Sequence, residues 1–159
     1  MTAPVHTAEQ RLRDLGLVLP PASDPAGHYA PTVRSGQLLF LSGKAPVAEG
    51  AHKPRGKLGR DYTADDGYRL ARGACLDLLS ALQAALGSLD KVSRIVELHG
   101  ALNTTADFED HARVLDGASD LLVEVFGQAG VHARSVIGVA SLRGGVPLTV
   151  RATVECTLD

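Results

Sequence analysis

The sequence has few aromatic residues and few cysteines. Tryptophan is absent, and phenylalanine and tyrosine together make up 4% of the chain. The core must therefore be built mainly from Leu, Val, Ile and Ala, whose small side chains suit close packing between strands, helices or subunits. Cys75 and Cys156 form no C-x-x-C pair, and the neighbours of each predict a buried apolar face. We interpret both as small hydrophobic residues, which is typical of a reducing compartment.

A long apolar run and an excess of one charge are also missing. No window approaches the ~18 apolar residues of a membrane span, and the N-terminus lacks a basic segment followed by an apolar one. We therefore expect a cytoplasmic protein with no membrane partner. The 16 Lys and Arg residues are balanced by 18 Asp and Glu residues, which gives a net charge of −2. This balance argues against bulk nucleic-acid binding, which usually requires a basic face.

Several strong catalytic motifs are absent. Gly43-Lys44 lacks both the earlier glycine and the following Ser or Thr of a P-loop. No G-x-G-x-x-G, G-x-S-x-G or H-E-x-x-H sequence occurs, and the 6 histidines show no i,i+4 pair that would suit a metal. We expect neither a cofactor nor a structural metal.

The length of 159 residues fits one domain. Such a chain can bury about 68–70% of its unfolded surface, so it needs no metal or disulfide to hold a core. We divide it into an N-terminal helix and linker, residues 1–26, and a single domain, residues 27–159. Helical spacing predicts a short helix after Thr7, a long one between the Thr63 capping box and Gly87, and a third from about Asp107 to Phe126. Gly117 is expected to bend or interrupt the third helix.

Apolar runs and alternation predict five strands, at residues 29–34, 37–41, 92–102, 134–140 and 148–158. Ser35-Gly36 and Arg143-Gly144-Gly145 are interpreted as the turns of two hairpins. The apolar run 38–41 predicts a strand covered on both faces. Alternation within 92–102 predicts that Ile95, Glu97 and His99 share one face.

The resulting order is helix, hairpin, helix, strand, helix, hairpin. It favours an α+β fold with a mixed β-sheet and helices packed on one face. Neither face of the expected sheet is wholly polar, so we expect oligomerisation to cover the second face.

A few polar residues stand at the ends of the expected elements. Arg134 opens a strand after a Gly-rich turn, where its planar guanidinium could bind a carboxylate or simply face solvent. Tyr29 could point into a cleft or anchor a loop. Ser42 could form a hydrogen bond with a ligand or with the turn in which it lies. His99 on a strand is more often a hydrogen-bonded core imidazole than a base, and His132 is interpreted as a loop residue.

Most of the chain, from about Gly27 to Thr157, resembles the RidA (reactive intermediate deaminase, YjgF-type) family, and is most similar to its longer, less characterised branch. The resemblance is carried by an ordered set of segments: GQLLFLSG (36–43), GKLG (56–59), DGASDLLVEVFG (116–127) and HARSVIGVASL (132–142). It implies a chorismate-mutase-like α+β fold and a homotrimer with ligand clefts between subunits.

The resemblance also implies roles for individual residues. Arg134 would bind the carboxylate of a 2-imino or 2-keto acid, with Tyr29 lining the cleft and Ser42 and Gly43 shaping it. Backbone groups near Val136 would polarise the imine.

The sequence departs from the family pattern at three positions. The acid on the last strand that is thought to position the attacking water is replaced by Thr149, and a second acid is replaced by Arg151. Lys44 stands where the family has Gln and is expected to add positive charge near the cleft.

Three hypotheses follow from the resemblance. The first is an enzyme that hydrolyses 2-imino acids, with Thr149 holding the water. The second is a non-catalytic trimer that binds a small carboxylate as a sensor or scavenger. The third is RNA cleavage, which the net charge of −2 makes the least favoured.

Overall fold

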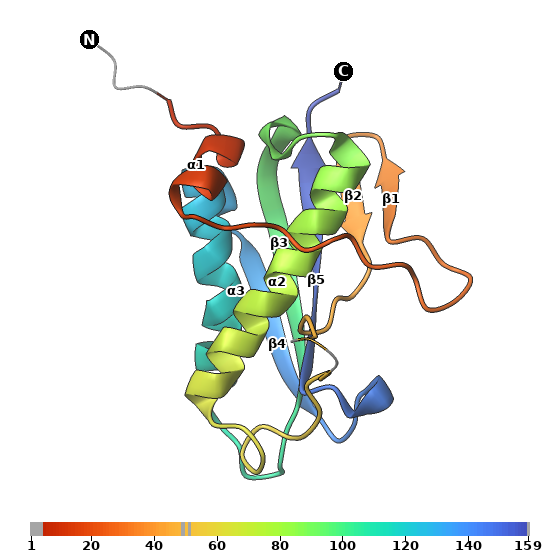
Figure 1. Cartoon of the computed structure of the whole chain (residues 1–159), viewed down its shortest axis with the longest axis vertical. Helices are drawn as coiled ribbons and strands as arrows, with labels where there is room; N and C mark the ends of the chain where they lie inside the picture. The colour runs from red at the N-terminus through yellow and green to blue at the C-terminus, as the bar shows by residue number, and fades with distance from the viewer. Residues whose placement is uncertain (1–4, 49, 51, 159) are drawn as a thin grey trace.

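The computed structural model describes residues 5–48, 50 and 52–158. These residues form a five-stranded mixed sheet and three α-helices. Figure 1 shows all three α-helices on the same side of the sheet. The expected α+β fold with helices on one face is therefore confirmed.

The α-helices begin and end close to the positions expected from the sequence. α1 (Ala8–Asp14) begins after Thr7, whose hydroxyl accepts from an amide of the first turn. α2 (Ala64–Leu86) has the complete capping box, because the side chains of Thr63 and Asp66 each accept from the other's backbone N–H. It ends at Gly87, whose φ of +83° favours glycine. α3 (His111–Phe126) starts later than the sequence suggests.

The sheet has the strand order β1-β2-β5-β3-β4. Its members are β1 (Thr32–Ser35), β2 (Leu38–Leu41), β3 (Val92–Asn103), β4 (Ala133–Val139) and β5 (Leu148–Cys156). The β1–β2 hairpin is confirmed, and only β3 and β4 pair in parallel among the described strands.

The second expected hairpin is wrong. β4 and β5 are not neighbours, because β3 lies between them and pairs with both. β3, α3 and β4 form a β-α-β unit, whose crossover helix returns the chain to lay β4 parallel to β3 at the sheet edge. Residues 140–147 then carry the chain past β3 to β5.

Irregular pairing in β3 changes which of its residues share a face. The register with β5 shifts between Val92 and Arg94 and again between Ile95 and Glu97. An extra residue in a strand reverses the alternation beyond it. Ile95 is therefore buried beneath the helices, whereas Glu97 lies on the opposite face with its partner Thr153. The expectation that Ile95 and Glu97 share a face is wrong.

Gly117 does not interrupt α3, which is continuous from His111 to Phe126. A Cβ atom at this position would lie 2.0 Å from the carbonyl oxygen of Tyr68 on α2. The glycine therefore permits close contact between two helix backbones. The interpretation of Gly117 as a bend is wrong.

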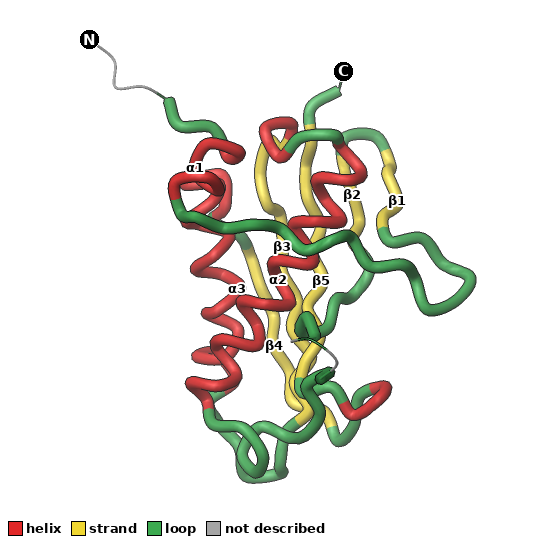
Figure 2. Tube along the Cα trace, viewed as in Figure 1, coloured by secondary structure: helices red, strands yellow, loops and turns green. Residues whose placement is uncertain are grey.

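The hydrophobic core lies between the sheet and the α-helices. Its largest fully buried side chains are mostly leucines, as the scarcity of aromatic residues requires. Both cysteines are buried and unpaired, as expected. The segment after α1 crosses the exposed side of α2 before the chain reaches β1 (Figure 2), and the hydroxyl of Ser80 donates to the carbonyl of Pro20 along this path.

The other face of the sheet carries no helix in the described part of the chain (Figure 1); we call it the open face. Leu39 and Leu41 of β2 point into the core, but Phe40 between them is 44% exposed on the open face. The expectation that β2 is covered on both faces is therefore wrong for the single chain. Val33 and Ile137 add further exposed apolar surface to this face.

Candidate ligand-binding site

Arg134 lies at the start of β4 with its side chain against α3. It pairs with the buried Leu98, which places both side chains on the helix-covered face. Nη1 of Arg134 lies 2.8 Å from a carboxylate oxygen of Asp116 and donates to the Ser119 hydroxyl at 3.0 Å, while Nη2 donates to the Ala112 carbonyl at 3.3 Å. The guanidinium is thus held in one orientation, with 27% of the side chain exposed.

The hydroxyl of Ser119 also contacts His132. Nδ1 of His132 lies 2.6 Å from the carbonyl oxygen of Gly130, and because a carbonyl only accepts, Nδ1 carries the proton. In the neutral ring Nε2 is then the acceptor, and it receives the Ser119 hydroxyl proton at 2.9 Å. Ser119 accepts from Arg134 and donates to His132, so the three side chains form a directional hydrogen-bond chain.

These contacts leave two N–H donors of the Arg134 guanidinium without a protein acceptor in the described part of the chain. They are the N–H of Nε and the second N–H of Nη2. Nε and Nη2 form the side-on pair of donors that binds both oxygens of a carboxylate. The arrangement can therefore bind a small carboxylate without breaking the contacts to Asp116 and Ser119.

The sequence identified Arg134 but not the partners that orient it. Asp116 and Ser119 are three residues apart, which places them on one face of α3. That spacing, opposite a strand-opening arginine, is the signal that could have found them.

Three other predicted residues cluster at a different place. The Ser42 hydroxyl donates to the carbonyl of Ala30 at 2.7 Å, so it holds the loop that contains Tyr29. The ring of Tyr29 is 52% exposed, and its hydroxyl accepts from the backbone N–H of Ala26. Ser42 and Tyr29 therefore each stabilise a loop, which was one of the two roles expected for each residue. A Cβ atom on Gly43 would lie 4.0 Å from Cβ of Thr149.

Arg134 and Thr149 are not brought together within one chain. Thr149 faces the open side and aligns across β3 with Ile137 of β4. Two strand spacings of about 4.8 Å and three residues of about 3.3 Å separate its position from that of Arg134, whose side chain points the other way. Val136 lies on the same face as Arg134 and packs against the core.

The expectation for Lys44 is wrong. Its side chain is directed toward α2 and only 6% exposed, and Nζ donates to the Ser23 hydroxyl at 2.9 Å. Ser23 in turn donates to a carboxylate oxygen of Asp77 at 2.9 Å. The lysine charge is thus compensated inside the fold and is not presented beside Gly43.

Arg151 does face the open side, where it pairs with His99. His99 is not a core imidazole, because it lies on the same open face and contacts Glu97 and Ser135.

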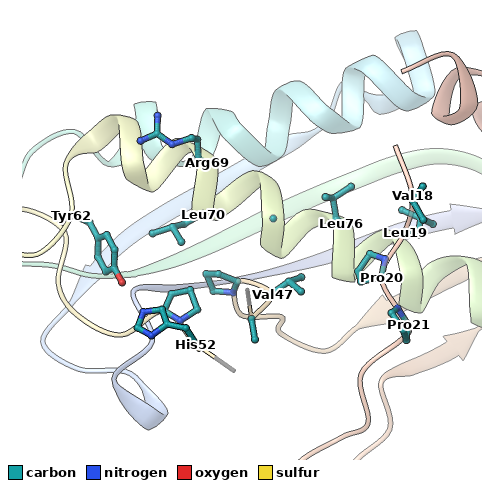
Figure 3. Close-up of a pocket in the computed structure, with 14 residues that line it drawn as sticks. Val18, Leu19, Pro20, Pro21, Val47, His52, Tyr62, Arg69, Leu70 and Leu76 are labelled. Carbon is teal, nitrogen blue, oxygen red and sulfur yellow. The ribbon is translucent and has the colours of Figure 1, made fainter. Parts of the chain in front are cut away.

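An apolar pocket of about 640 Å³ lies elsewhere, beside α2. Figure 3 shows Leu70 and Leu76 projecting from α2, Val47 from a preceding segment below the helix, and Leu19 from another segment at the end near Leu76. None of the predicted site residues lines this pocket, so it is separate from the Arg134 site.

The described residues contain no group of three or more His, Cys, Asp or Glu side chains that could hold a metal ion. None of the helices in that part of the chain has both the length and the hydrophobicity that crossing a membrane requires.

The chain is similar to known proteins both in sequence and in structure. The model of the family described as "YjgF/chorismate_mutase-like, putative endoribonuclease" matches residues 9–147. Protein TCP17 of Trypanosoma cruzi is 41% identical over 145 residues, which are 91% of this chain and 91% of that protein.

Solved structures are also similar to this chain in sequence and fold. A structure described as a putative endoribonuclease, from Shewanella oneidensis, is 37% identical with a TM-score of 0.90, and the match covers 94% of this chain and 99% of that one. A protein of unknown function from Agrobacterium tumefaciens is 35% identical with a TM-score of 0.86, covering 94% and 92% of the two chains. RidA from a Psychrobacter species, at 19% identity and a TM-score of 0.57 over 84% of this chain and 93% of that one, supports the fold alone.

Proposed function

Because the chain belongs to the YjgF/chorismate-mutase-like family, we propose that it binds small 2-keto or 2-imino carboxylates through Arg134, in clefts between the subunits of a homotrimer. The observation that carries this proposal is the guanidinium of Arg134, which Asp116 and Ser119 orient while its Nε keeps no acceptor among the described residues. A planar, fixed guanidinium loses little freedom when a carboxylate binds side-on.

The trimer is proposed for two reasons. The open face exposes Val33, Phe40 and Ile137, a set of apolar side chains that a second chain would cover. Arg134 and the Ser42–Gly43–Thr149 cluster also lie on opposite faces, so a cleft that contains both must take them from different chains. A closed ring of three identical chains supplies that combination at every interface.

Calorimetric titration with 2-ketobutyrate and pyruvate tests the binding site. We expect wild type to bind and Arg134→Ala to lose at least tenfold in affinity. Arg134→Lys should also bind weakly, because an ammonium cannot supply two parallel donors. Arg143→Ala, in the turn after β4, is the matched control and should bind as wild type does. Absence of heat with wild type, or equal affinity in Arg134→Ala, contradicts the proposal.

Hydrolysis of 2-imino acids is a second candidate, favoured by the Ser119–His132 pair. Thr149 supplies a hydroxyl but no base, and the acid nearest along its face of β5 is Glu155, roughly 20 Å away at ~3.3 Å per residue. His132, by contrast, is connected to Arg134 through the Ser119 hydroxyl, from which Nε2 of His132 accepts a hydrogen bond. It could take a proton from water while the imine becomes a ketone and releases ammonia.

Amino-acid oxidase coupled to the purified protein tests this candidate. We expect faster release of 2-ketoacid with wild type, and a loss with His132→Gln that leaves 2-ketobutyrate affinity unchanged. Binding without any acceleration would leave the protein as a sensor or scavenger of carboxylates.

Endoribonuclease activity, which the family description names, is the least supported candidate. A net charge of −2 provides little attraction for a phosphate backbone. RNA is expected to remain intact after prolonged incubation with the protein.

A further inference from the structure

The apolar pocket beside α2 has no part in the function proposed above; we call it the α2 pocket. Its volume of about 640 Å³ falls within the range of about 300–1,000 Å³ that is typical of small-molecule sites. It lies beside a helix, whereas the proposed trimer buries the opposite, open face of the sheet. Assembly through the open face therefore leaves the α2 pocket accessible.

The α2 pocket is elongated along the helix. Figure 3 shows His52 and Tyr62 at one end, and Leu76 and Leu19 toward the other. Leu70 and Leu76 both project from α2, and six residues of α-helix correspond to about 9 Å at 1.5 Å per residue. An apolar space of this length suits an alkyl chain of medium length.

The wall of the α2 pocket contains Gly73. Glycine inside a helix is less favourable than alanine. Close packing requires the glycines at Gly67 and Gly117, where a Cβ atom would lie 2.7 Å and 2.0 Å from the nearest atoms of the facing helix. A Cβ atom at Gly73 would meet no heavy atom within 4 Å, so packing does not require glycine there. Its effect is to keep open the space that a side chain would fill.

The polar side chains of the lining are His52, Tyr62 and Arg69. The guanidinium of Arg69 lies 2.6 Å from a carboxylate oxygen of Asp66, and Figure 3 shows it projecting away from His52. The Tyr62 hydroxyl donates to the backbone carbonyl of Arg55 and accepts from its N–H. The imidazole of His52 is therefore the side chain with which a polar group of a ligand can pair.

We propose that the α2 pocket binds an uncharged aliphatic alcohol of medium chain length. The hydroxyl lies at His52, and the alkyl chain runs along α2 toward Leu76. A hydroxyl both donates and accepts, so it can pair with a ring nitrogen of His52 whether or not that nitrogen is protonated. A carboxylate would have to compete with Asp66 for Arg69, and a carboxylate that leaves water without a partner is unfavourable.

Displacement of the uncharged fluorophore 1-aminoanthracene from the full chain tests the ligand class. We expect 1-octanol to displace it, and 1-hexanol to require about tenfold more because two methylene groups are missing. Octanoate should be at least tenfold weaker than 1-octanol, because its charge finds no free partner in the pocket. The proposal is overturned if 1-octanol has no effect or if octanoate binds as tightly.

The variant Gly73→Leu tests the location. Its side chain can extend into the pocket without a clash at Cβ, so we expect at least a tenfold loss of 1-octanol affinity with no loss of stability in urea. Ala85→Leu, at an exposed position of α2 outside the pocket, is the matched control and should bind as wild type does. His52→Leu removes one hydrogen bond and should weaken binding about threefold to tenfold. Unchanged affinity in Gly73→Leu or His52→Leu overturns the proposal.

Two cross-checks separate the α2 pocket from carboxylate binding at Arg134, on which this proposal does not depend. Gly73→Leu should bind 2-ketobutyrate as wild type does, and Arg134→Ala should keep its affinity for 1-octanol. In ¹H–¹⁵N spectra of the full chain, 1-octanol should shift the amide signals of Leu70, Gly73 and Leu76 and leave that of Arg134 in place. Loss of 1-octanol binding in Arg134→Ala would place the alcohol at the other site and overturn the proposal.

Discussion

Arg134 and Thr149 project from opposite faces of one sheet, with β3 between their strands. The family resemblance assigns both to one cleft, yet a small carboxylate cannot reach both within a single chain. A site that includes both residues must therefore combine Arg134 of one subunit with Thr149 of another.

Hybrid trimers test this arrangement. Arg134→Ala removes the anion-binding group, and Thr149→Tyr fills the facing side of the cleft, so either variant alone should fail to bind 2-ketobutyrate. In a closed trimer made from a 1:1 mixture, each mixed ring has one interface where both wild-type residues meet. About a quarter of the wild-type sites should therefore return.

The measurement is calorimetric stoichiometry after the two variants are refolded together. Mixing without refolding is the control, because intact homotrimers contain no restored site. Failure of the refolded mixture to recover any binding would place the two residues in different sites.

The open face is expected to be the trimer interface. Phe40→Glu places a charge at an apolar position of that face that is 44% exposed, and burying this charge without a partner opposes assembly. We expect wild type to have three times the mass of one 16.6 kDa chain and the variant to run as a monomer in size-exclusion chromatography with light scattering. Val123→Glu, at an exposed position on α3, should stay trimeric. A monomeric wild type would refute the interface.

Two glycines in helices should respond oppositely to alanine. Gly117→Ala would place a methyl group 2.0 Å from the Tyr68 carbonyl oxygen, so the helices must move apart, at a cost of about 1–3 kcal/mol. Gly73→Ala meets no heavy atom within 4 Å and should stabilise α2 by about 0.5–1 kcal/mol. Urea unfolding of both variants measures these changes. Equal changes in unfolding free energy for the two variants would show that the close approach of α2 and α3 does not require glycine at position 117.

The buried side chains of Lys44 and Asp77, which are bridged by the hydroxyl of Ser23, should behave as one unit. Asp77→Leu leaves the Lys44 ammonium without its compensating charge, and we expect a loss of about 3–5 kcal/mol in unfolding free energy. Lys44→Met combined with Asp77→Leu should recover most of that loss, because no buried charge remains. A double-mutant cycle in urea measures the coupling. If the losses in unfolding free energy of Lys44→Met and Asp77→Leu simply add in the double variant, the two residues are not coupled.

The thiols should be unreactive in the folded protein. Burial raises the pKa of Cys75 to about 12, so almost no thiolate is present near pH 8. Cys156 is buried as well, with its Sγ 3.4 Å from the Gln37 carbonyl oxygen. Titration with a chromogenic disulfide at pH 8 should detect neither thiol until denaturant is added, and then both. Rapid labelling of the native protein would indicate local opening around α2 or β5.

The elements themselves follow from local sequence. The Thr63–Asp66 capping box and the Gly87 terminus define α2 because they satisfy backbone groups within a few residues. The scarcity of aromatic residues and the alternation of the last strand likewise predict a leucine-rich core under β5. The four segments that resemble the family are also short stretches of sequence, and one of them contains Arg134. This residue could therefore be identified from the sequence alone.

Pairing and side-chain direction depend on distant parts of the chain. The sequence suggested that β4 turns back on β5, but α3 carries β4 to the far side of β3, where it pairs in parallel. One irregularity near Val96 turns Ile95 inward and Glu97 outward.

The sequence by itself determined the fold class, the main helices and the arginine at the centre of the proposed site, because these depend on short-range spacing and composition. Only the tertiary structure decided that Asp116 and Ser119 orient Arg134, that Lys44 is buried against Ser23, and that Glu97, His99 and Ser135 meet. The physical reason is that a hydrogen bond requires atoms about 3 Å apart, and sheet register, which brings residues from separate strands to that distance, is set by the whole fold.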